Sequence, residues 1–124
     1  DSLYRIPTKF LNDFDEKSIS KYVENMGVKP LNDGLSIDSM NNVYMADVEH
    51  NGIARKTVGG KLETLIKDKR IRWADGLSFG GDGYLYFNDS AMPDQLMRSQ
   101  SHIKESAPYS IFRFKTGYRG NPGR

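Results

Sequence analysis

The chain has 124 residues, of which 37% are hydrophobic and 11% aromatic, an amount that suits one packed domain of ordinary size. Its 18 basic and 16 acidic residues leave a net charge of +2. This charge is spread along the chain, so we expect neither nucleic acid nor a membrane as a partner. The sequence contains no cysteine, which excludes disulfides, thiolate metal sites and cysteine nucleophiles.

The first segment of the chain combines strands with one helical turn. Residues 2–6 (Ser-Leu-Tyr-Arg-Ile) alternate as a strand does and resemble residues 110–114 (Ser-Ile-Phe-Arg-Phe), with Arg at the fourth place in both. Residues 13–22 begin with acidic side chains and place Ile19 three residues before Tyr22, which predicts a helical turn. A strand is expected to follow over residues 22–26.

The central part of the chain repeats itself. Residues 33–37 (Asp-Gly-Leu-Ser-Ile) and 43–47 (Val-Tyr-Met-Ala-Asp) return as residues 75–79 (Asp-Gly-Leu-Ser-Phe) and 85–89 (Leu-Tyr-Phe-Asn-Asp), always 42 residues later. In each copy two short runs of β-branched and aromatic residues enclose turn formers, at 38–42 and 80–83. Each copy therefore predicts a β-hairpin.

Further strands are expected after each hairpin. Residues 52–56 and 61–66, joined by a Gly-Gly turn, extend the first copy to four strands, and residues 110–114 extend the second copy. Between these, residues 93–107 open with Pro and an acid, as helices do, and Leu96, Met97 and Ile103 are predicted to share an apolar face. This insertion is either a packed surface excursion or a lid.

Hairpins repeated at about 40–45 residues are typical of a β-propeller, an all-β fold built from four-stranded antiparallel blades. We expect an incomplete blade over residues 1–31, a full blade over 32–72, a blade with a helical insertion over 73–116, and a tail over 117–124. Strands 2–6 and 110–114 would each be a third strand. Because a propeller needs about four or more blades to close, further blades or another chain should complete the fold.

Strand polarity predicts which polar residues share one face of the propeller. The starts of innermost strands, the ends of second strands and the loops to third strands all lie at one face, whereas the turns near Asn41 and Asp82 lie at the other. The residues expected at the first face are Asp33, Asp47, Glu49, His50, Asn51, Trp73, Asp75, Asn88, Asp89 and Ser90. Asp33 and Asp75 begin innermost strands and should point to the central channel.

Several of these residues have a structural explanation beside a functional one. Asp33 and Asp75 either bind a ligand or belong to Asp-Gly turns in which Gly adopts positive φ. Asp47 and Asp89 are expected to cap turns, and His50 is expected to be solvated or to bridge a loop rather than to act as a base.

Three other side chains need the same comparison. Trp73 either packs between blades or holds a substrate ring at the channel rim. Ser90 lacks a Gly-x-Ser-x-Gly context, which argues against a serine nucleophile. The sequence gives less reason to expect a functional role for His102, which lies in the insertion, than for His50.

Residues 70–80 and 82–86 resemble the major royal jelly protein and yellow group, within the gluconolactonase and regucalcin-like superfamily of six-bladed propellers. Residues 33–36, 49–51, 62–65 and 108–114 extend the resemblance over most of the chain. The match is to the C-terminal part of such proteins. Secretion or a periplasmic location is favoured by this resemblance alone.

The resemblance also implies chemistry. Gluconolactonase-like enzymes bind a divalent cation in the channel, so Asp33 and Asp75 are expected as calcium ligands and as the catalytic carboxylates of a lactone or ester hydrolase. Arg72, Trp73, His50 and Asn88 are expected to bind the substrate. Royal jelly and yellow-like proteins include ligand binders without established catalysis. A propeller that encloses a small aromatic or amine ligand with Trp73, Tyr86 and channel carboxylates therefore stays open.

Overall fold

The computed structural model describes residues 1–12 and 16–121, and its strands form antiparallel sheets, as expected for an all-β fold. The strands are β1 (Ser2–Arg5), β2 (Glu24–Val28), β3 (Leu35–Ile37), β4 (Val43–Asp47), β5 (Gly52–Lys56), β6 (Leu62–Lys67), β7 (Ala74–Phe79), β8 (Tyr84–Asp89) and β9 (Ile111–Lys115). The helices are α1 (Glu16–Ile19), α2 (Gln100–Glu105) and the 3₁₀ turns η1 (Thr8–Phe10), η2 (Ser20–Tyr22) and η3 (Met92–Asp94).

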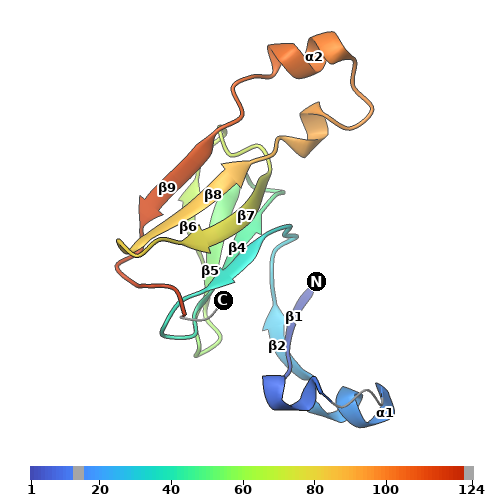
Figure 1. The fold of residues 1–124 in the computed structure, drawn as a ribbon, viewed down its shortest axis with the longest axis vertical. Helices are drawn as coiled ribbons and strands as arrows, with labels where there is room; N and C mark the ends of the chain where they lie inside the picture. The colour runs from blue at the N-terminus through green and yellow to red at the C-terminus, as the bar shows by residue number, and fades with distance from the viewer. Residues whose placement is uncertain (13–15, 122–124) are drawn as a thin grey trace.

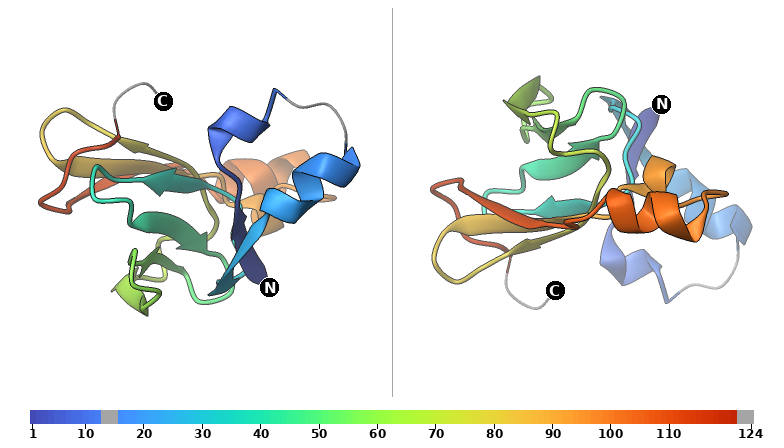
Figure 2. Two further views of the ribbon diagram at one scale, coloured as in Figure 1. Left: turned by 90° about the horizontal axis from the view of Figure 1, so that it is seen from below. Right: turned by 90° about the horizontal axis from the view of Figure 1, so that it is seen from above.

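These strands form three separate sheets (Figure 1). β1 pairs with β2, the order β3-β4-β5-β6 makes a four-stranded sheet, and β7-β8-β9 makes a three-stranded sheet. The two larger sheets lie beside each other at an angle, with the β1–β2 pair to one side (Figure 2). None of the sheets closes on itself.

The hairpin repeat is confirmed, down to its register. Ser36 pairs with Tyr44 in the first copy, and Ser78 pairs with Tyr86 in the second. The third strands also match, because Tyr44 lies opposite Arg55 and Tyr86 lies opposite Arg113. The 42-residue period of the sequence therefore reflects two sheets of equivalent pairing.

The core lies where the two larger sheets meet. Tyr44, with 0% exposure, packs its ring edge-on against Phe79, 5.1 Å between centroids. The buried cluster draws on both sheets and contains Tyr44, Ala46, Ile53, Ile71, Ala74, Leu77, Leu85 and Phe87. Among the apolar and aromatic residues of the second and third strands, Tyr44, Met45 and Phe87 are buried, and Tyr86 and Phe112 are half-buried.

The Asp-Gly pairs are not turns, contrary to one of the two sequence interpretations. Gly76 lies inside β7, and neither Gly34 nor Gly76 adopts positive φ. Gly34 instead permits a close approach of the sheets, because a Cβ at this position would lie 1.7 Å from the carbonyl oxygen of Asp75. The glycine therefore allows β3 and β7 to run side by side.

An aspartate stabilises each hairpin turn, a feature that the sequence analysis missed. Asp38, with 0% exposure, accepts hydrogen bonds from the Asn42 N–H at 2.9 Å and the Tyr44 hydroxyl at 3.1 Å. Asp82 accepts a hydrogen bond from the Tyr86 hydroxyl at 2.9 Å, which holds the pKa of that carboxyl below its ordinary value. The repeated tyrosine thus joins its strand to its turn in both copies.

Two helical predictions need correction. Helical structure extends through η2 to Tyr22, so β2 begins at Glu24 rather than at Tyr22, while residues 13–15 of the predicted turn lie outside the described residues. In the insertion, η3 and α2 are separate. Leu96 and Met97, at 63% and 106% exposure, do not share an apolar face with Ile103. Met97 has φ of 57°, which ends any continuous helix there.

The segment after β9 returns to the four-stranded sheet. Ser39 donates its N–H to the Arg119 carbonyl at 2.8 Å, and Asn121 donates to the Ile37 carbonyl at 3.3 Å. Gly120 also forms a bridge with Asp38. The described part of this tail therefore extends past the end of β3, and β9 remains the edge of its sheet.

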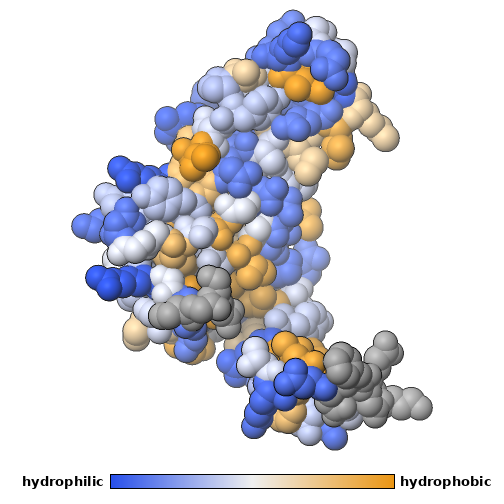
Figure 3. Space-filling view, viewed as in Figure 1, coloured by the Kyte–Doolittle hydropathy of each residue, from blue (hydrophilic) through white to orange (hydrophobic). Residues whose placement is uncertain are grey.

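An apolar hollow of about 500 Å³ separates the β1–β2 pair from β3. Figure 3 shows apolar side chains gathered at the surface between these parts. Leu35, at 52% exposure, lines the hollow, while Lys56 spans it by donating its Nζ to the Val28 carbonyl at 2.9 Å. In the described residues, no helix is long and apolar enough to cross a membrane.

Candidate functional site

Asp33 and Trp73, predicted at the same face from different repeats, touch each other. The indole Nε1 of Trp73 donates a hydrogen bond to Asp33 Oδ2 at 2.8 Å. Asp33 is exposed and precedes β3, and Trp73 is half-buried and precedes β7. The contact orients one carboxylate and fixes the aromatic ring beside it.

Asp75 lies next to this pair. Its backbone carbonyl approaches Gly34 so closely that no side chain would fit between them. Its carboxylate is half-buried and makes no hydrogen bond or ion pair with any described residue. Asn88 lies nearby on β8, where its Oδ1 would be 2.9 Å from a Cβ placed on Gly76. Asp33 and Asp75 therefore lie at the starts of neighbouring strands, the first held by an indole and the second without a partner among the described residues.

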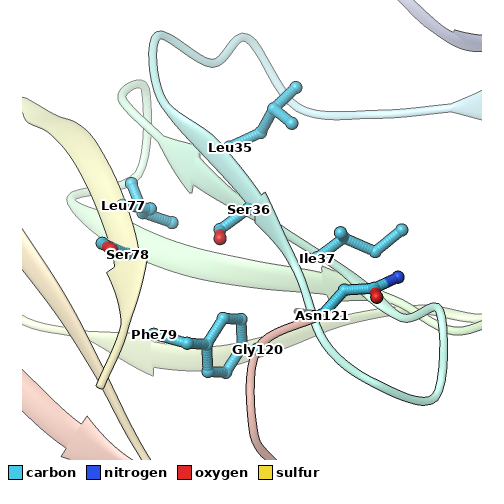
Figure 4. A pocket seen from close by; sticks show the side chains of 8 residues that line it. All are labelled: Leu35, Ser36, Ile37, Leu77, Ser78, Phe79, Gly120 and Asn121. Atoms are coloured by element: carbon cyan, nitrogen blue, oxygen red, sulfur yellow. The ribbon is translucent and has the colours of Figure 1, made fainter. Parts of the chain in front are cut away.

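A pocket of about 290 Å³ lies between β3 and β7 (Figure 4). The strands that begin beside Asp33 and Asp75 supply most of its wall, and the returning tail supplies the rest. Its lining residues are Leu35, Ser36, Ile37, Leu77, Ser78, Phe79, Gly120 and Asn121. Ser36 and Ser78 occupy equivalent places in the repeat and bring hydroxyl groups to a pocket that apolar side chains, Gly120 and Asn121 complete.

Asp89 organises the loop that carries Trp73. Its Oδ1 accepts hydrogen bonds from the backbone N–H groups of Arg72 at 3.1 Å, Trp73 at 2.9 Å and Ala91 at 3.3 Å. Its Oδ2 accepts from Arg72 Nε at 2.7 Å. The side chain is 1% exposed, so this buried charge is compensated by a paired cation and by backbone donors. Asp89 therefore binds Arg72 and holds the loop before β7, in addition to the turn capping that the sequence predicted.

Arg72, predicted to bind substrate, makes its described contacts with protein groups. Besides the ion pair with Asp89, its Nη1 donates to the Ser106 carbonyl at 2.7 Å and its Nη2 to the Pro108 carbonyl at 3.0 Å. The guanidinium also lies 5.3 Å from the centroid of the Tyr109 ring. These contacts attach the insertion to the three-stranded sheet, so the Arg72 side chain has a structural role in the described residues.

The loop after β4 lies beside the site and contacts the segment that leads to Trp73. His50 donates its N–H to Asp47 Oδ1 at 3.2 Å, which confirms the capping predicted for Asp47, and its Nδ1 lies 2.8 Å from the same oxygen. The His50 side chain is 61% exposed, and its described partner is Asp47. Asn51 donates its Nδ2 to the Ile71 carbonyl at 2.9 Å and so fixes the segment that leads to Trp73.

The described residues supply only part of a metal site. Among residues 1–12 and 16–121, no group of three or more His, Cys, Asp and Glu side chains could hold a metal ion. Calcium takes about six to eight oxygen ligands. Asp33 and Asp75 would therefore contribute a minority of the ligands, and a complete site would need oxygen atoms from elsewhere.

Part of the predicted face comes together in the described residues, whereas Asp47 and His50 pair with each other. Ser90 donates its N–H to the Trp73 carbonyl at 3.0 Å, which joins it to the group formed by Asp33, Trp73, Asp75 and Asp89. His50 instead pairs within its own loop. The interaction between Arg72 and Asp89 was missed. An acid at a strand end 17 residues after an arginine gives too weak a signal to find it.

Among known proteins, neither a family model nor a curated protein matches this sequence.

Proposed function

We propose that this chain is part of a β-propeller of the royal jelly, yellow and gluconolactonase-like kind. The supporting observations are two antiparallel sheets of equivalent register and the contact of Gly34 with Asp75, which sets their first strands side by side. In this arrangement β3 and β7 are innermost strands of successive blades. Their starts face a shared channel that further blades complete.

The proposed activity is the hydrolysis of a lactone or a related ester. One observation carries it: the half-buried Asp75, whose carboxylate has no partner among the described residues, packs its backbone against Gly34, next to Asp33, whose carboxylate an indole holds in place. Because the two carboxylates have different surroundings, they can have different roles in the reaction. A free carboxylate can accept a proton from a water molecule, while an oriented one stays ionised and fixes the position of the substrate or a ligand.

In this proposal each residue has a defined task. Asp75 removes a proton from the attacking water, and Asp33 orients the Trp73 ring, against which the substrate packs. A bound calcium ion would polarise the lactone carbonyl and lower the pKa of water. Asp33 and Asp75 would be two of its ligands, as their oxygen chemistry allows. The pocket between β3 and β7 begins two residues further along these strands, at Leu35 and Leu77.

The second candidate is a propeller that binds a small ligand without catalysis. This candidate is favoured because two of the predicted polar residues already form hydrogen bonds within the protein. Trp73 donates to one oxygen of Asp33, and Arg72 donates to Asp89. A half-buried indole beside two carboxylates suits an aromatic or amine ligand. The two candidates share a site and differ in whether Asp75 transfers a proton.

The first prediction separates these candidates in the complete protein. Asp75→Asn and Asp33→Asn should each lower the rate of sugar-lactone hydrolysis by about a hundredfold or more, because an amide keeps the shape but loses the basic, charged oxygen. The control is Asp68→Asn, which removes a half-buried carboxylate paired with the exposed Arg70 and should leave the rate unchanged. Calcium binding is measured in parallel by calorimetry.

Full activity in both variants would refute the catalytic assignment. Unchanged calcium affinity would remove both residues from the set of metal ligands. If the wild-type protein hydrolyses no lactone but binds an aromatic amine, and both substitutions weaken that binding, the second candidate replaces the first.

A further inference from the structure

The loop between β4 and β5 contains the only Asn-Gly dipeptide of the sequence, Asn51-Gly52. Because glycine has no side chain to hinder its backbone nitrogen, this is the dipeptide in which asparagine loses ammonia most readily. The asparagine is half-buried and the glycine is buried. The surrounding fold therefore decides whether the two residues adopt the geometry that the reaction needs.

The fold requires these two residues for separate reasons. Asn51 has φ of 56°, in the left-handed region that asparagine tolerates better than most residues. Gly52 begins β5, where a Cβ would lie 2.5 Å from the carbonyl oxygen of Ile66 on β6. A residue suited to the turn is thus followed directly by the one residue that the close strands admit. The reactive dipeptide follows from the structure of the loop.

Two hydrogen bonds hold Asn51 to the segment 68–71. Its Nδ2 donates to the Ile71 carbonyl at 2.9 Å, and its backbone carbonyl accepts from the Asp68 N–H at 2.9 Å. The segment closes on itself, because the Ile71 N–H donates to the Asp68 carbonyl at 2.8 Å. Ile71 is 3% exposed and belongs to the core. The Asn51 amide is therefore released toward the Gly52 nitrogen only when this segment moves away.

We propose that Asn51 is a modification site, at which the side chain deamidates when the segment 68–71 opens. In the first step, the Gly52 backbone nitrogen forms a bond to Asn51 Cγ, the bond from Cγ to Nδ2 breaks, and ammonia leaves with the proton of the Gly52 N–H. Water then adds to one carbonyl of the cyclic imide and opens the ring. The product at position 51 is aspartate or isoaspartate, with no change of oxidation state.

Neither product restores the contact with the segment 68–71. A carboxylate has no N–H to donate, so its oxygens would face the carbonyl oxygen of Ile71. Isoaspartate also lengthens the backbone by a methylene, which shifts Gly52 from its partners on β4 and β6. Because the segment leads to Trp73, deamidation loosens the loop before β7. The inference is independent of the proposed hydrolase activity, since it concerns amide chemistry in a loop.

The first test compares deamidation in the folded chain and in a peptide of residues 47–56 (Asp-Val-Glu-His-Asn-Gly-Ile-Ala-Arg-Lys) in one buffer. Mass spectrometry after digestion follows each asparagine. Asn51 should react about tenfold or more slowly in the folded chain than in the peptide, because the reaction awaits local opening. In the chain unfolded by urea, Asn51 should react before Asn41, which has φ of 63° in the folded chain but precedes another asparagine.

The second test opens the segment. Ile71→Ala should accelerate the reaction at Asn51, because it removes core contacts that hold the segment 68–71. Hydrogen exchange of the Asp68 amide measures the opening in the same samples. Val58→Ala, which shortens an exposed side chain in the turn between β5 and β6, should leave both rates unchanged. If Ile71→Ala does not fold, the wild type in urea below its unfolding transition replaces it, and both rates should rise together.

The third test concerns the product. Asn51→Asp should lower the folded-to-unfolded ratio in urea roughly tenfold, because the Ile71 carbonyl loses its donor. Asn41→Asp adds the same charge at an exposed position and should leave the ratio nearly unchanged. Equal rates at Asn51 in the folded chain and the peptide would overturn the proposal. So would a rate that does not follow the exchange of the Asp68 amide, or equal stability of the two variants.

Discussion

Three aspartates of this chain that lie close together in space have different surroundings. Asp33 is exposed and bound by one indole N–H, Asp75 is half-buried and unpaired, and Asp89 is buried with an arginine and three backbone donors. Burying a charge is tolerable only when hydrogen bonds replace its water, which Asp89 achieves, whereas Asp75 is half-buried and keeps access to solvent. The difference is what separates a structural carboxylate from a candidate for chemistry.

Replacing Asp89 by Ala should reduce the free energy of unfolding by about 3–5 kcal/mol, because Arg72 loses a buried counter-charge and three N–H groups lose their acceptor. Urea denaturation followed by the fluorescence of Trp73, the only tryptophan, measures this loss. The control is Asp68→Ala, which breaks an exposed ion pair with Arg70 and should cost much less. Equal losses in the two variants would contradict the role given to Asp89.

At the scale of elements, the segment before β3 lies so close to β7 that no side chain fits between them at Gly34. A glycine is needed there because the Asp75 carbonyl occupies the place where any other residue would carry its Cβ. The repeat predicted both hairpins and their pairing, because periodicity of 2 and turn residues determine register locally. The turn that the sequence offered as one of two explanations of Asp33-Gly34 is wrong, and the contact between sheets that requires Gly34 leaves no local signal in the sequence.

Gly34→Ala should therefore push β3 away from β7 and lower the free energy of unfolding by about 1–3 kcal/mol. Gly81→Ala is the matched control, because no atom lies within 4 Å of a Cβ added at that position. Thermal or urea unfolding of both variants provides the comparison. If the two substitutions have the same effect, the two sheets do not approach each other as described.

At the scale of the whole molecule, long-range consequences of the fold were the hardest to predict. The grouping of Asp33, Trp73 and Asp75 followed from strand polarity, which is set by the order of the hairpins. The return of residues 119–121 to Ile37 and Ser39 did not, because backbone bonds carry no sequence pattern. The separate η3 and α2 were missed for a local reason, since Leu96 and Met97 look apolar in sequence yet point to solvent.

The central claim is that the carboxylates at 33 and 75 lie at one shared site, in adjacent strands of successive repeats. Because the chain has no cysteine, Asp33→Cys combined with Asp75→Cys offers a single pair of thiols for a short bifunctional thiol reagent. The account predicts that this pair is cross-linked within one chain about tenfold or more faster than a pair at 33 and 82, since Asp82 lies in the turn at the opposite end of β7. Equal rates for the two pairs, measured by mass spectrometry, would contradict it.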